Sequence, residues 1–193
     1  MSTVEAARMT ADDLLAMPDE ICFELVNGQL LERNMSEESC WIGGEIFRLL
    51  SNYVKGKSLG RAFPDGNGFQ CFKDSQQVRK PDAAVVLQAR ATGPLAKRGY
   101  TRVAPNLAVE VISPGDEAYD INQKIEDWLS AGVDEVWIVM PPARNVTVYT
   151  REQSPRTFRS DEELVSVHGV PGFRCLVADL FSENDASQSS ASG

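Results

Sequence analysis

The chain lacks the features that mark membrane, secreted and zinc-binding proteins. No apolar run reaches the roughly 18 residues that a transmembrane helix needs. The first residues, MSTVEAARMTADD, contain neither the basic nor the apolar region of a signal peptide. The four cysteines are far apart and form no C-x-x-C pair, and the chain has a single histidine. This pattern argues against a zinc site and against a disulfide framework. These absences predict reduced thiols in a cytoplasmic protein.

Positive charge is also scarce. There are 19 Lys and Arg against 28 Asp and Glu, a net charge of −9, which disfavours bulk, nonspecific binding of nucleic acid. Residues 71–102 are the exception, with seven basic residues and two acids. This segment would suit a phosphate backbone, although a solvated loop explains its charge about equally well. The candidate nucleic-acid contacts in it are Arg79, Lys80, Lys97 and Arg98.

The order of elements indicates the fold class. The 193 residues are enough for one domain with a sizeable core, which we assign to residues 1–181. Residues 182–193, SENDASQSSASG, are small and polar and predict a disordered tail. The elements read as helix, hairpin, helix, several strands and then strand–helix–strand. This order predicts an α/β (α+β) fold, a mixed β-sheet flanked by helices.

Local signals place the elements. Thr10 and the acids that follow it are typical of a helix start. Asn27-Gly28 predicts a hairpin across residues 22–32, with Glu24 on its first strand at the edge of the sheet. Apolar residues at helical spacing predict a long helix over residues 37–55. Further strands are predicted at residues 61–64, 68–72, 78–87 and 146–149, with short strands up to about 173 and a loop over 89–105.

The stretch 106–139 carries two charges where apolar residues are expected. It reads as a buried strand, an amphipathic helix and a second buried strand. Glu110 lies inside the apolar run Leu107–Ile112, where a carboxylate is costly unless a metal, a cation or hydrogen bonds compensate it. Lys124 falls on the inward stripe of the helix. Its simpler explanation is an exposed helical pair with Asp120.

Asp82 is the proposed companion of Glu110. It follows Pro81, which belongs at the start of a strand because it has no N–H for the sheet. Carboxylates on neighbouring core strands repel each other unless one is protonated or a cation bridges them. Oxygen ligands of this kind favour Mg²⁺ or Mn²⁺. Asp82 alone could be a turn residue, and Glu24 alone could be an ordinary exposed acid on a hairpin.

These residues and their order resemble the PD-(D/E)XK nuclease superfamily, and more closely its Uma-type restriction endonuclease family. The likeness covers residues 9–181. It is carried by Phe-Glu24-Leu-Val-Asn-Gly, Gly68-Phe69, Arg-Lys-Pro81-Asp82, Val-Glu110-Val-Ile-Ser-Pro, Lys124 and Gly132-Val with Val-Trp137-Ile-Val. The resemblance implies a restriction-endonuclease-like core.

The same resemblance assigns roles to residues. Asp82 and Glu110 would hold Mg²⁺ (or Mn²⁺), and Glu24 would be an accessory acid. The superfamily's lysine normally lies two residues after the second acid, where this chain has Ile112, and Lys124 takes its role from the helix. Family members often carry a histidine near the start of the long helix, where this chain has Ser39 or Cys40.

The expected activity is metal-dependent hydrolysis of phosphodiester bonds in nucleic acid, with DNA as the expected substrate. Lys124 would orient the attacking water or stabilise the transition state. A homodimer is expected, because nucleases that cut both strands often use one site for each. The alternative is a non-catalytic DNA-binding or assembly protein with the same fold, which the −9 charge favours. A two-carboxylate glycosidase would not need Lys124, and no aromatic sugar platform is evident.

Overall fold

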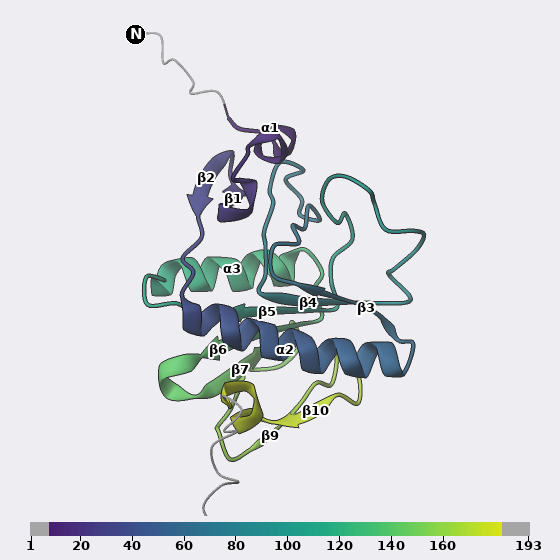
Figure 1. Ribbon diagram of the computed structural model, residues 1–193, viewed down its shortest axis with the longest axis vertical. Coiled ribbons are helices and arrows are strands. Elements are labelled where there is room, and N and C mark those ends of the chain that lie inside the picture. The colour runs from purple at the N-terminus through teal and green to yellow at the C-terminus, as the bar shows by residue number, and fades with distance from the viewer. Residues whose placement is uncertain (1–7, 183–193) are drawn as a thin grey trace, which may run out of the picture.

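A six-stranded mixed sheet lies at the centre of the protein (Figure 1). The computed structural model describes residues 8–182. The strand order is β3-β4-β5-β6-β7-β8, in which β5 and β6 are parallel and the other neighbours antiparallel. The strands are β3 (Gly60–Pro64), β4 (Ala83–Leu87), β5 (Leu107–Val111), β6 (Glu135–Met140), β7 (Asn145–Tyr149) and β8 (Arg156–Phe158). The predicted mixed sheet flanked by helices is confirmed.

Two helices cover opposite faces of the sheet. α2 (Glu37–Gly56) packs Ile42, Ile46 and Leu50 against one face. α3 (Ala118–Ser130) packs Ile125 and Trp128 against the other. Parallel strands need a crossover between them, and α3 supplies it for β5 and β6. Both helices were expected from their spacing of apolar residues. Among residues 8–182, no helix is long and apolar enough to cross a bilayer.

The N-terminal part begins with α1 (Ala11–Ala16), a short 3₁₀ turn η1 (Glu20–Cys22) and the hairpin of β1 (Phe23–Val26) and β2 (Gln29–Glu32). Thr10 caps α1 in a capping box with Asp13, as predicted. Asn27 and Gly28 have φ of 53° and 75°, the positive values that a type I′ turn requires. α1 and the hairpin lie together at one end of the molecule, above α3 (Figure 1).

The placement of the hairpin corrects the prediction for Glu24. β1 and β2 form a separate two-stranded sheet and do not extend the edge of the central one. Beyond its own partner strand, β1 is bridged through Leu25 to Val78. The reason is that α1, Val78 and Tyr100 cover the hairpin in a small apolar cluster of its own. Glu24 is consequently buried, with 2% of its surface exposed.

One predicted strand is not formed, and another is shorter than expected. Residues 68–72 form no strand, and Phe69 makes single bridges to Arg79 and Thr101. The segment predicted as one strand over 78–87 is a strand only from Ala83 onward. Pro81 interrupts the ladder because it lacks an N–H to donate.

The C-terminal part packs on the face of the sheet that α2 covers. It comprises the 3₁₀ turns η2 (Pro141–Ala143) and η3 (Val177–Phe181), and the two-stranded sheet of β9 (Glu163–Val165) and β10 (Arg174–Leu176). Leu164, Val177 and Leu180 join the apolar cluster of α2. Ser182 donates from Oγ to the carbonyl of Ala178 at 2.9 Å. The rest of the predicted polar tail, residues 183–193, lies outside the described residues.

Candidate active site

Asp82, immediately before β4, lies beside Glu110 of β5. The Asp82 N–H donates to the carbonyl of Val109 at 2.9 Å. The Asp82 Oδ2 accepts a hydrogen bond from the N–H of Val111 at 2.6 Å. Glu110 lies on the α3 face of the sheet with Ala108, and Asp82, whose Cβ faces Gly43 of α2, lines the same cleft as Glu110. The structure therefore brings together the two acids that the sequence pattern singled out.

Two side chains of α3 bind the carboxylate of Glu110. Lys124 Nζ donates to Oε2 at 3.1 Å, and Trp128 Nε1 donates to Oε1 at 2.8 Å. Lys124 and Trp128 are one helical turn apart and therefore share a face of α3. Within the described part of the chain, Lys124 pairs with Glu110, and Asp120 makes no ion pair. The helical pair considered for Lys124 is thus not formed.

Trp128 has a role in the site as well as in the core. It is fully buried, and its indole N–H also fixes the orientation of Glu110. Its position one turn after Lys124 on the inward stripe was a signal that could have indicated this second role.

Arg33 is a site residue that the sequence analysis missed. It follows β2, and 6% of its side chain is exposed. Its Nη2 donates to Asp65 Oδ1 at 2.6 Å and lies 3.5 Å from Asp82 Oδ1. The guanidinium thus lies between two carboxylates that are far apart in the sequence. No local pattern marks Arg33, because its partners are brought to it only by the folded hairpin.

The charges in this site alter one another's protonation. Burial, together with the neighbouring Glu110, raises the pKa of Asp82 to about 7, against the opposing effects of the Val111 N–H and Arg33. Burial by itself would lower the pKa of Lys124, but the carboxylates of Glu110, Glu24 and Asp82 outweigh it and raise that pKa. Lys124 is therefore a firmly charged ammonium group, whereas Asp82 is divided between its two forms near neutral pH.

Glu24 belongs to a buried ion-pair network that extends from the hairpin to α3. Its Oε2 accepts from Arg79 Nη1 at 2.8 Å, and its Oε1 from the N–H of Lys80 at 2.7 Å. Arg79 also donates from Nη2 to Asp127 of α3 at 2.5 Å. Burial opposes ionisation of Glu24, but Lys124, Arg79 and the Lys80 N–H prevail and lower its pKa to about 2. Glu24 thus contributes a permanent negative charge near Lys124.

Two of the predicted nucleic-acid contacts are buried. Arg79 is 2% exposed and Lys80 is 0% exposed. Lys80 Nζ pairs with the carboxylate of Glu20 at 2.5 Å and also donates to its backbone carbonyl. Their burial and pairing do not fit contact with a phosphate backbone, and their charge serves the internal network. Lys97 and Arg98 are exposed in the segment after β4, as a surface contact requires.

Ser39 and Cys40 occupy the place where the resembling family often has a histidine. Ser39 is buried, and its Oγ lies 2.9 Å from Ser113 Oγ, so that it ties the start of α2 to the end of β5. Ser39 also completes a capping box with Ser36. Cys40 is exposed. Ser39 is thus held in hydrogen bonds that stabilise the structure beside the site.

The donor set fits a hard cation held by few protein ligands. A narrow cleft opens beside Asp82 and Glu110, and Asp116 and Asp120 also line it. Within residues 8–182, no three or more His, Cys, Asp and Glu side chains are grouped to hold a metal ion. Mg²⁺ commonly binds through one or two carboxylates and completes its shell with water and substrate phosphate. Two adjacent carboxylates satisfy that requirement.

The chain is similar to one known protein family and to a solved structure. A model of the family "Uma2: Putative restriction endonuclease" matches residues 11–178. Among solved structures, a putative nuclease of DUF820 from Anabaena variabilis is similar in fold, with 23% identity and a TM-score of 0.75. The match covers 90% of this chain and 97% of that one. A search of curated proteins finds no match. The family match confirms the resemblance found in the sequence.

Proposed function

Because this chain belongs to the Uma2 family, whose description is "Putative restriction endonuclease", we propose that it is a Mg²⁺-dependent endonuclease that hydrolyses phosphodiester bonds in DNA. The observation that carries the proposal is the group of Asp82, Glu110 and Lys124 at one cleft. Asp82 is 19% exposed and Lys124 23% exposed at the side chain, so both reach the solvent from a largely buried position.

Asp82 and Glu110 would hold the cation. Both present oxygens from adjacent strands, and the N–H of Val111 and the indole of Trp128 fix their orientation. When bound there, Mg²⁺ would lower the pKa of a water ligand and neutralise charge on the phosphate. Arg33 Nη2 lies 3.5 Å from Asp82 Oδ1 and helps to keep the carboxylate in place.

Lys124 would act on the reacting groups. Its ammonium group lies 3.1 Å from Glu110 Oε2, next to the carboxylates and within the same cleft. A fixed positive charge there orients an attacking water or stabilises the negative charge that develops on the phosphate oxygens. The buried Glu24 strengthens this arrangement because its negative charge raises the pKa of Lys124 and keeps the ammonium protonated.

One observation favours the alternative of a non-catalytic DNA-binding protein. Lys124 and Trp128 between them satisfy both oxygens of Glu110 without a metal ion. A protein that had lost catalysis could keep this pairing as a structural ion pair. The pairing alone would not explain why Asp82, whose pKa burial raises, is placed beside Glu110 at the cleft.

Cleavage of DNA by matched variants tests the proposal. Plasmid DNA incubated with Mg²⁺ is expected to be cut by the wild type, whereas Asp82→Asn, Glu110→Gln and Lys124→Met each reduce the rate by about 100-fold or more, because each removes a charge needed at the reacting phosphate. Asp120→Asn, an exposed acid lining the same cleft, serves as the control and should retain activity. Glu110→Gln that kept both metal binding and cleavage would contradict the mechanism. A wild type inactive on plasmid, linear and single-stranded DNA would favour the alternative.

A further inference from the structure

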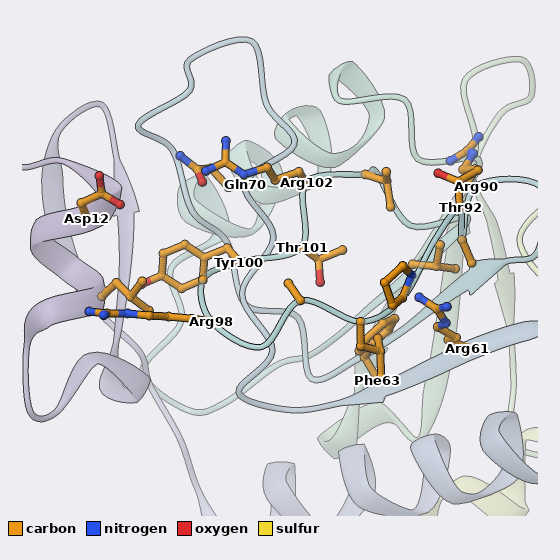
Figure 2. A pocket seen from close by; sticks show the side chains of 18 residues that line it. Asp12, Arg61, Phe63, Gln70, Arg90, Thr92, Arg98, Tyr100, Thr101 and Arg102 are labelled. Carbon is orange, nitrogen blue, oxygen red and sulfur yellow. The ribbon is translucent and has the colours of Figure 1, made fainter.

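A second pocket lies apart from the catalytic cleft, between α1 and the segment after β4 (Figure 2). Its volume is about 300 Å³, at the lower end of the range for ligand sites. Figure 2 shows Arg98, Tyr100 and Arg102 on one side, Arg61 and Phe63 on the other, and Thr101 between them. The lining is therefore a mixture of guanidinium, hydroxyl and aromatic groups.

The arginines of this pocket differ in how they are engaged. Arg90 is committed to the structure, since it donates to three backbone carbonyls and pairs with Asp134 at 2.7 Å. Arg61 donates to the carbonyl of Gly93 at 2.6 Å. Arg98 and Arg102 are exposed. Within residues 8–182, Arg61, Arg98 and Arg102 make no ion pair. The acid in the lining is Asp12, so the pocket has an excess of positive charge.

The pocket and the catalytic cleft lie on the same face of the sheet. Val86 lines the pocket, and Asp82 precedes the same strand, β4. Asp82 and Val86 are four residues apart, about 13 Å along an extended chain. Aromatic contacts join the two places: Phe63 of the pocket packs on Phe69, and Phe69 packs on Trp128, both with ring centroids 5.9 Å apart. Trp128 in turn donates to Glu110, so the two sites are held in a fixed relation.

The catalytic cleft by itself is poorly suited to hold a polyanion. Asp116 and Asp120 line it in addition to the two catalytic carboxylates, against the positive charges of Arg33 and Lys124. With a net charge of −9 on the chain, attraction for a nucleic acid must come from a local basic surface. Within the basic segment, Arg79 and Lys80 are internally paired. Its exposed basic residues are Lys73, Lys97, Arg98 and Arg102, and of these Arg98 and Arg102 line the second pocket.

We propose that the pocket lined by Arg61, Arg98 and Arg102 binds backbone phosphates of the same DNA whose scissile phosphate lies at Asp82 and Glu110. Guanidinium groups bind phosphate through paired N–H donors, and the hydroxyls of Thr92 and Thr101 are further donors in the lining. The proposal rests on the proposed function for its ligand.

The salt dependence of binding tests this site without knowledge of the target sequence. Phosphate contacts are independent of sequence, and each contributes about 0.9 to the slope of log K against log salt concentration. A fluorescent DNA duplex of mixed sequence is titrated with wild type and with Arg98→Ala/Arg102→Ala in EDTA, where cleavage does not interfere. The double variant is expected to bind at least about tenfold more weakly at low salt, with a slope smaller by roughly 2. Arg174→Ala, an arginine 62% exposed on β10, is the matched control and should bind as the wild type does.

The inference would be overturned by no binding of the duplex by the wild type at low salt, by an unchanged slope in the double variant, or by an equal loss in the control. A mononucleotide that bound the wild type as tightly as the duplex and lost binding in the double variant would assign the pocket to a free nucleotide and also overturn it. Failure of the proposed function is recognised separately, by cleavage. In that case the wild type would not cleave DNA with Mg²⁺, or Asp82→Asn and Glu110→Gln would cleave like the wild type, whatever the arginine variants do in the binding assay.

Discussion

Asp82 carries a carboxylate at the start of β4, where burial and the charge of Glu110 raise its pKa to about 7 from an ordinary value of 3.8. The folded protein therefore binds more protons at this residue than the unfolded chain does, between about pH 4 and pH 7. Since stability falls with rising pH wherever the folded state binds the extra proton, ionised Asp82 destabilises the metal-free protein above about pH 7. A bound cation would offset that cost.

This linkage predicts that Asp82→Asn stabilises the metal-free protein at alkaline pH. The neutral amide avoids the buried charge, so the free energy of unfolding at pH 8 should rise by roughly 1–3 kcal/mol. At pH 4, where Asp82 is protonated in the folded state, the gain should vanish. Denaturant unfolding in EDTA at the two pH values measures it. A variant less stable than the wild type at pH 8 would show that Asp82 is a structural ion-pair residue of Arg33.

The candidate catalytic residues could be found in the sequence to the extent that they interrupt apolar patterns. Glu110 and Lys124 stand out because a charge on a buried strand or an inward helical stripe needs a reason. Arg33 could not be found in this way, since it lies in a polar stretch and meets Asp65 and Asp82 only through the fold. The burial of Arg79 was not expected either, because a basic segment is typical of an exposed surface.

At the scale of elements, the hairpin of β1 and β2 is joined to α3 by charge. Glu24 on β1 pairs with Arg79, which pairs with Asp127 on α3, the helix that carries Lys124 and Trp128. Removing one partner from a buried ion pair is strongly destabilising because the other charge is left uncompensated. The network therefore positions α3 relative to the hairpin, which Arg33 directly follows.

Glu24→Gln is expected to destabilise the protein by roughly 3 kcal/mol at neutral pH, because Arg79 loses a buried carboxylate partner. The stabilising effect of the Glu24 charge is present above about pH 4.5 and is lost as the pH falls toward its lowered pKa of about 2. The difference between variant and wild type should therefore shrink over that range. Urea unfolding from pH 7 to pH 3 measures it.

Glu32→Gln is the control for this experiment, since Glu32 is an exposed glutamate on the other strand of the same hairpin. It should change the free energy of unfolding by less than about 0.5 kcal/mol. Equal stability of Glu24→Gln and Glu32→Gln would show that the buried network does not hold the hairpin in place.

Elements set by local chemistry were predictable, and those set by distant contacts were not. The caps of α1, the Asn27-Gly28 turn and the apolar stripes of α2 and α3 are all encoded within a few residues. The position of the hairpin depends on the cluster with Val78 and Tyr100, far along the chain. The strand expected over 78–87 begins only at Ala83. Pro81 has no N–H to donate to the ladder and therefore separates residues 78–80 from the strand.

At the scale of the whole molecule, charge is separated between two places on one face of the sheet. The cleft at Asp82 and Glu110 is lined by four carboxylates and the second pocket by four arginines. This separation suits a nuclease that recruits a cation at one place and a phosphate backbone at the other. The homodimer that cutting of both strands would require, and the assignment of residues 1–181 to one domain, stay predictions.

The central claim is that Asp82 and Glu110 form a metal site, and calorimetric titration of Mn²⁺ tests it most directly. The titration is made at pH 7.5 in the presence of inorganic phosphate, which can complete the coordination shell. We predict one site in the wild type and in Asp120→Asn, no binding in Asp82→Asn, and weaker binding at pH 6, where Asp82 is largely protonated. Equal binding by the wild type and Asp82→Asn, or no binding by either, would contradict the account.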